Sequence, residues 1–148
     1  MSEPDVLEIS IYVAAVPETV FPYFTDPHRY SQWMGTQVEL DPRPGGIYRV
    51  AMREGLETSG SFVDLDPPNR VEFTWGWTGD CVVPPGSSRV VVTLAAENGG
   101  TRVLLRHHGL PTSEQRDHHG QGWDVYLSRL SVCILGGDPG PDPNGEVM

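Results

Sequence analysis

Through much of the chain, hydrophobic and polar residues alternate with a period of two, which is typical of strands that bury one face. The clearest example lies at residues 71–77, where Val71, Phe73, Trp75 and Trp77 share one face. Alternating or β-branched segments predict further strands at residues 6–13, 38–40, 47–53, 59–65, 90–94 and 101–108. Turn residues separate many of these segments. The pattern therefore predicts a bent antiparallel sheet of about six or seven strands.

Helical spacing appears between the first two predicted strands. Pro17 suits a first helical position, and the apolar residues after it predict a short helix from Pro17 to about Phe24. A second short helix, capped by the sequence TDP at residues 25–27, ends at Gly35. Its apolar residues are Tyr30, Trp33 and Met34.

One long amphipathic helix follows the last predicted strand. It begins near Ser113, which can cap it, and runs to about Leu135. Its apolar stripe consists of His119, Trp123, Tyr126, Leu127, Leu130 and Ile134. Gly120 and Gly122 are unusual inside a helix, where each costs roughly 1 kcal/mol relative to Ala. They are tolerable if the backbone passes close to the sheet or to the mouth of a cavity.

The order of these elements predicts an α+β fold of the helix-grip kind. In such a fold a bent antiparallel sheet wraps around a single long helix, and a pocket opens between the helix and the concave face of the sheet. We expect one domain over residues 1–136. Residues 137–148 are rich in Pro and Gly and are expected to form a disordered tail.

Charge and composition argue against several functional classes. The chain has 10 Lys and Arg against 20 Asp and Glu, a net charge of −10, which disfavours nucleic acid and anionic membrane surfaces. All the basic residues are Arg, so a Schiff-base lysine is excluded. No apolar run approaches the roughly 20 residues of a membrane helix. The acidic N-terminal residues are unlike a secretory leader, and Cys81 and Cys133 are widely spaced, so a cytoplasmic protein with free thiols is expected.

Several segments, in the same order and covering the chain to about residue 135, carry a family resemblance. They are residues 17–21, 26–27 with 33–35, 44–48, 60–68, 71–75, 100–107, 109–111, and 122–123 with Leu127, Arg129 and Leu130. The series resembles the bacterial branch of the heat-shock-protein-90 ATPase activator (Aha-type) family, within the START-like or SRPBCC group. The resemblance implies a helix-grip fold with a hydrophobic cavity. That group includes lipid carriers, polyketide cyclases and co-chaperones, so several functions stay open.

Two pairs of adjacent histidines are candidates for chemistry. His107 and His108 lie on a strand and point to opposite faces, and His118 and His119 diverge by about 100° on a helix, so neither pair can chelate one ion. His107 and His119 can both face the cavity. Two histidines without a carboxylate or thiolate form a poor zinc site, so we expect no metal and no cofactor. They act either as a hydrogen-bonded interior pair or in ligand recognition or acid–base chemistry.

The predicted cavity lining is mainly aromatic, and indole rings can stack on a flat apolar ligand while seeking a partner for each N–H. The candidate ligand-binding residues are Trp33, Tyr48, Met52, Phe62, Phe73, Trp75, Trp77, His107, His119, Trp123, Tyr126 and Leu127. The pattern leaves open whether Phe62 or Val63 faces inward. Strand parity places Arg49, Arg53 and Arg106 on the solvent side.

Three functional hypotheses follow. The first is a protein that binds a small hydrophobic molecule, such as a lipid, a polyketide or another aromatic compound, through burial of apolar area. The second is an enzyme of the cyclase, dehydratase or hydrolase type, with His107 or His119 as general base. The third is a co-chaperone-like interaction module with a collapsed interior. In each case we expect a monomer or homodimer that neither binds nucleic acid nor inserts into membranes.

Overall fold

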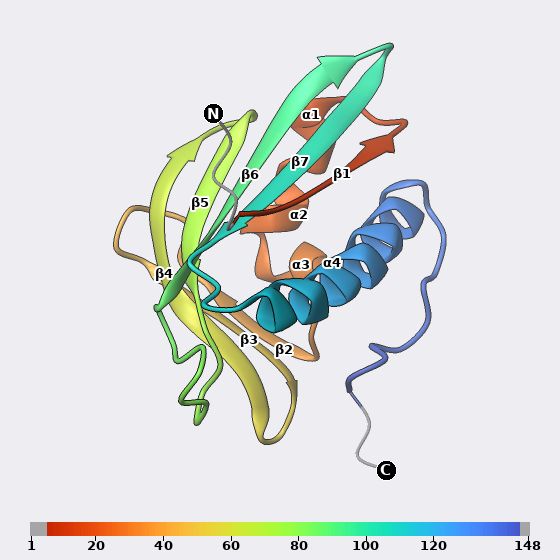
Figure 1. Ribbon diagram of the computed structural model, residues 1–148. Helices are drawn as coiled ribbons and strands as arrows, with labels where there is room; N and C mark the ends of the chain where they lie inside the picture. Colours follow the sequence, from red (N-terminus) through yellow and green to blue (C-terminus); the bar gives the residue numbers. More distant parts are fainter. Residues whose placement is uncertain (1–5, 146–148) are drawn as a thin grey trace.

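The alternating segments form one curved antiparallel sheet in the computed structural model, which describes residues 6–145 (Figure 1). The strand order is β1-β7-β6-β5-β4-β3-β2. Every neighbouring pair from β2 to β7 is consecutive in sequence, whereas β1 joins the far edge beside β7. The strands are β1 (Leu7–Val13), β2 (Gln37–Leu40), β3 (Ile47–Arg53), β4 (Leu56–Asp66), β5 (Arg70–Trp75), β6 (Ser88–Glu97) and β7 (Gly100–His108).

Three short helices carry the chain from β1 to β2 at the opposite edge, and they are α1 (Pro17–Val20), α2 (Pro22–Thr25) and α3 (Pro27–Ser31). The predicted single helix from Pro17 to Phe24 is divided at Phe21, because Pro22 lacks the N–H that would continue the first helix. The third helix starts at its predicted cap but ends at Ser31. Trp33 and Met34 therefore lie in the turn that follows.

The long helix α4 (Ser113–Ile134) lies across the concave face of the sheet, which confirms the predicted helix-grip arrangement (Figure 1). Its cap is Thr112 rather than Ser113, since the Thr112 hydroxyl accepts a hydrogen bond from the Gln115 N–H at 3.1 Å. Gly120 brings the helix close to the sheet edge. A Cβ there would lie 3.2 Å from Cδ1 of Leu7 on β1.

Side chains from both layers fill the space between α4 and the middle of the sheet. Tyr48 stacks on Phe73 with ring centroids 4.0 Å apart. Phe62, rather than Val63, faces inward, and the β4–β5 register shifts directly after it. This irregularity is a bulge that bends the sheet around the helix. The hydroxyl groups of Tyr48 and Tyr30 are hydrogen-bonded inside this core.

The described part of the segment after α4 is held against the fold at two points. Arg129 of α4 donates hydrogen bonds to the backbone carbonyls of Trp33, Pro139, Gly140 and Pro141. Further on, the buried Asp142 carboxylate accepts hydrogen bonds at 2.7 Å from the Gly35 N–H and from the Tyr126 hydroxyl. This differs from the disordered tail predicted by composition, because a few long-range polar contacts fix a segment with little apolar surface.

Residues 1–5 and 146–148 lie outside the described part of the chain, so the expected disorder at residues 146–148 is not addressed. Over residues 6–145, no helix has both the length and the apolar character needed to cross a membrane.

Replacing Asp142 by Ala is expected to lower the free energy of unfolding by about 3 kcal/mol, since it removes charge-assisted hydrogen bonds and leaves buried donors unpaired. Urea denaturation measures the change. The matched control is Asp138→Ala in the same segment, where an exposed carboxylate accepts one backbone N–H. We expect the control to cost less than about 1 kcal/mol. Equal effects of the two substitutions would show that Asp142 does not anchor this segment.

Candidate functional site

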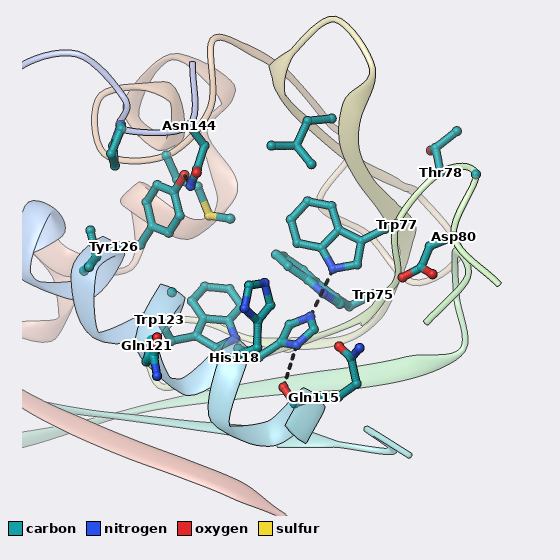
Figure 2. Close-up of a pocket in the computed structure, with 17 residues that line it drawn as sticks. Trp75, Trp77, Thr78, Asp80, Gln115, His118, Gln121, Trp123, Tyr126 and Asn144 are labelled. Atoms are coloured by element: carbon teal, nitrogen blue, oxygen red, sulfur yellow. Dashed lines mark hydrogen bonds between the residues drawn. The ribbon is translucent and has the colours of Figure 1, made fainter. Parts of the chain in front are cut away.

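An open pocket of about 740 Å³ lies between α4, the end of β5 and the described part of the C-terminal segment (Figure 2). Four aromatic residues line it, with Trp75 and Trp77 on the sheet side and Trp123 and Tyr126 on α4. A polar rim surrounds these rings and includes Thr78, Asp80, Gln115, His118, Gln121 and Asn144. The pocket thus combines an aromatic floor with hydrogen-bonding groups at its edge, as small-molecule sites commonly do.

Trp77 owes its position to the close approach of two backbone segments. The strand β5 ends at Trp75, although the sequence pattern continues to Trp77. Gly76, between them, has no room for a Cβ because the carbonyl of Pro84 lies directly against it. The loop from residue 78 to 87 thereby folds back over the end of the strand. The backbone N–H of Trp77 donates a hydrogen bond to the Val83 carbonyl at 2.7 Å. Only glycine permits this contact.

His119 is held in one neutral tautomer by two hydrogen bonds. The Trp77 indole N–H donates to its Nε2 at 3.0 Å, and its Nδ1 lies 2.8 Å from the Gln115 carbonyl oxygen (Figure 2). An indole nitrogen can only donate and a carbonyl can only accept. Nε2 is therefore the unprotonated nitrogen, and the Nδ1–H donates to Gln115.

A second indole–imidazole hydrogen bond forms at His107, and here the indole belongs to the helix and the imidazole to the sheet. The indole N–H of Trp123 donates to His107 Nδ1 at 3.1 Å, so the proton resides on Nε2. That Nε2–H donates to the Ser88 hydroxyl at 2.9 Å, which donates in turn to the Trp75 carbonyl at 2.8 Å. His107 is fully buried. It links β7, β6 and β5 to the helix through one chain of hydrogen bonds.

Burial favours the neutral form of both imidazoles. It lowers the pKa of His107 well below its ordinary value of 6.5, and nearby His119 and His108 disfavour its charge further. Burial also lowers the pKa of His119. The His107 and His119 rings lie 5.3 Å apart, centroid to centroid, and bond to indoles rather than to each other. Protonating either ring would place its new N–H against an indole N–H.

The pocket gathers five of the residues predicted from sequence, and these are Trp75, Trp77, His119, Trp123 and Tyr126. The other seven are buried in the core without lining the pocket, and they are Trp33, Tyr48, Met52, Phe62, Phe73, His107 and Leu127. Strand and helix parity identify an inward face. They do not reveal which inward side chains are covered by others.

Several residues that line the pocket could not be predicted from any pattern in the sequence. Thr78 and Asp80 belong to an irregular loop, while Pro143 and Asn144 belong to the segment predicted to be disordered. Gly122 did give a signal as a glycine inside a helix. A Cβ at this position would meet nothing within 4 Å, so Gly122 lies at the open side of the pocket.

Metal-ligating side chains are dispersed rather than grouped. Across residues 6–145, no three His, Cys, Asp or Glu side chains come together in a way that could hold a metal ion. The groups that line the pocket are instead the aromatic rings of its floor and the hydrogen-bonding side chains of its rim.

The comparisons with known proteins bear on this fold and site. The family model for "Activator of Hsp90 ATPase homolog 1-like protein" matches residues 14–134. Among curated protein sequences, none matches the chain.

Solved structures show where the fold recurs. An AHSA1-like protein from Rhizobium etli is 41% identical, with a TM-score of 0.73, over 100% of this chain and 95% of that chain. CalU16 from Micromonospora echinospora is 26% identical, with a TM-score of 0.72, over 92% of this chain and 82% of that chain. DynU16, from the dynemicin biosynthetic locus, is 23% identical with a TM-score of 0.81. The match to DynU16 covers 93% of this chain but only 49% of that chain, and at this identity it shows the fold alone.

Stability is expected to fall as the pH drops below about 6.5, because the unfolded chain then binds protons that the buried imidazoles do not. In His107→Gln, the side-chain amide keeps a donor and an acceptor but does not titrate. Between pH 7.5 and 5.5 the wild-type protein should therefore lose about 1.4 kcal/mol more than this variant. Urea denaturation at the two pH values measures the difference.

The matched control for this experiment is His28→Gln, since the His28 side chain is exposed. The change in pH dependence caused by His28→Gln should be smaller than the change caused by His107→Gln. If His107→Gln also follows the wild type, burial of His107 does not set its protonation.

Proposed function

The chain belongs to the family of activator of Hsp90 ATPase homolog 1-like proteins, and from this premise we propose that its open pocket binds a small, neutral and largely apolar molecule. The observation that carries the proposal is the aromatic floor of the pocket, formed by Trp75, Trp77, Trp123 and Tyr126. A flat ligand that removes roughly 250 Å² of apolar surface from water gains about 6 kcal/mol before the entropic cost of association. Aromatic compounds and polyketides fit this description.

The charge of the pocket supports a neutral ligand. In the described structure none of the Arg side chains lines the pocket, and Asp80 is its one formally charged acidic group. The Asp80 carboxylate is already engaged, since it accepts hydrogen bonds from the N–H groups of Val82 and Val83. With a net charge of −10 on the whole chain and no guanidinium lining the pocket, an anionic lipid or fatty acid is disfavoured here.

The similar structures favour a natural product as the first ligand class to test. DynU16 is a protein of the dynemicin biosynthetic locus, and this chain shares its fold. The shared fold supports the choice of compounds and does not identify one of them.

The hydrogen bonds of the histidines favour binding over acid–base catalysis. A general base needs a free lone pair within reach of the proton that it removes. The only unprotonated nitrogen of each neutral ring accepts an indole N–H, from Trp77 at His119 and from Trp123 at His107. Catalysis by either imidazole would first have to break one of these bonds. A co-chaperone-like module, the third hypothesis, requires no ligand in the pocket.

Native mass spectrometry of the purified protein, followed by denaturing extraction, tests the proposal. A mass excess that disappears on denaturation is expected, and the released compound should be neutral and aromatic or otherwise largely apolar. Thermal-shift assays with aromatic polyketides, lipids and steroids provide the second measurement. A bare mass together with no shift from any compound would overturn the proposal in favour of an interaction module.

Gly122→Leu should separate stability from binding. Replacing a glycine inside α4 should raise the free energy of unfolding by about 0.5–1 kcal/mol, while the new side chain enters open space at the pocket. We expect the affinity for the compound with the largest thermal shift to fall at least about tenfold, which corresponds to a loss of about 1.4 kcal/mol.

The matched control is Gly122→Ala, which gives the same helix a comparable gain in stability but adds a single methyl group. Its affinity should stay within about twofold of wild type, a change of less than 0.5 kcal/mol. If Gly122→Leu binds as well as Gly122→Ala, the ligand does not occupy the pocket beside Gly122.

A further inference from the structure

The aromatic cluster at the pocket contains one more hydrogen-bond donor than it has acceptors. Trp75, Trp77 and Trp123 each carry one indole N–H, whereas His107 and His119, as neutral rings, each offer one acceptor nitrogen. Trp77 takes the acceptor of His119, and Trp123 takes that of His107. Among the described residues, the Trp75 N–H is left buried without a partner.

Trp75 lies at the floor of the pocket. It is 2% exposed, and its ring packs 4.9 Å from the Trp123 ring and edge-on, at 5.4 Å, to the Trp77 ring. Figure 2 shows it between these two indoles. A buried donor without an acceptor costs about 1–3 kcal/mol, and native proteins leave few of them. This donor lies beside an open pocket, where a partner can come from outside the chain.

A second buried polar group without a partner is found on the neighbouring strand. The Thr58 hydroxyl of β4 is fully buried and has no hydrogen-bond partner in the described structure. Thr58 forms a β-bridge with Trp77, two residues beyond Trp75. The unsatisfied polar groups thus belong to adjacent strands at the same end of the sheet.

Building on the proposed function, we propose that the ligand carries a neutral carbonyl group, as in a ketone or quinone, that accepts a hydrogen bond from the Trp75 indole N–H. A carboxylate could also accept this bond, but no Arg side chain lines the pocket to balance its charge. Because the Trp75 nitrogen is buried, the carbonyl reaches it only when a side chain at the pocket is displaced. Of the two indoles packed against Trp75, Trp77 is the more exposed, and its displacement would break the hydrogen bond to His119.

Fluorenone and fluorene test this proposal, because they share one flat ring system and differ by the carbonyl group. Isothermal titration calorimetry gives the affinity of each for the wild-type protein and for Trp75→Phe, which keeps an aromatic ring but removes the donor. The cost of desolvating the carbonyl is the same in both proteins. The ratio of fluorenone to fluorene affinity should therefore fall about tenfold in Trp75→Phe, as expected for loss of one buried hydrogen bond.

The control is Trp33→Phe, a buried indole outside the pocket whose N–H bonds to the Tyr23 carbonyl at 3.0 Å. It should leave the affinity ratio unchanged. An unchanged ratio in Trp75→Phe, with both compounds still bound, would overturn the carbonyl inference and leave the proposed function standing. It would indicate that a buried water satisfies Trp75. If neither compound binds the wild type, the proposal of a flat aromatic ligand falls, and the inference falls with it.

An NMR measurement on the wild-type protein does not depend on the folding of any variant. The chain has four Trp residues, and three of the indole N–H groups have acceptors within the protein. Fluorenone should move the Trp75 indole proton downfield, as hydrogen bonding does, and fluorene should not. Equal shifts with both compounds would contradict a bond to the carbonyl.

Discussion

Two hydrogen bonds between indole and imidazole rings hold α4 against the sheet, and the pocket depends on both. In one the sheet side donates from Trp77 to His119 of the helix, and in the other the helix donates from Trp123 to His107 of the sheet. Each bond requires a neutral imidazole, and burial supplies that condition by lowering both pKa values. Burial of the two imidazoles therefore keeps them neutral, and the hydrogen bonds that the neutral rings accept hold the packed arrangement in place. The reciprocal arrangement also fixes the orientation of two of the three indoles that line the pocket, Trp77 and Trp123.

The same bonds limit the chemistry of the site. Once both imidazole acceptors are occupied, His107 and His119 offer no free lone pair to a bound molecule. A flat neutral compound gains stacking area from such a surface, and an acceptor atom on it has an unpaired N–H to meet at Trp75. The polar balance of the cluster thus favours recognition. In this chain the two histidines supply the acceptors for two of the buried indole N–H groups.

Much of this arrangement could be predicted from local periodicity. Alternation with a period of two correctly placed Tyr48, Trp75 and His107 on the inner face, because neighbouring side chains on a strand point to opposite faces. Gly120 and Gly122 correctly marked a close approach to the sheet and an open side of the helix. Periodicity could not separate the pocket from the packed core, since that depends on how large side chains from several strands fill a common volume.

Long-range polar contacts could not be predicted from the sequence, for a different reason. The contact between Asp142 and Gly35 joins residues 107 positions apart, and no local pattern records it. Such contacts also place Asn144, whose side chain donates to the Tyr126 hydroxyl at 2.8 Å and lines one side of the pocket. Composition alone makes this segment look disordered, although a buried carboxylate and the Arg129 side chain hold it.

The floor and the rim of the pocket therefore differ in how they are held. The floor belongs to the sheet and α4, where apolar packing and the Trp–His bonds leave little freedom to change. The rim at Thr78, Asp80 and Asn144 comes from irregular segments held by a small number of hydrogen bonds. Substitutions there alter the shape and polarity of the opening without disturbing the core. The fold thus separates a closely packed aromatic floor from a polar rim built of irregular segments.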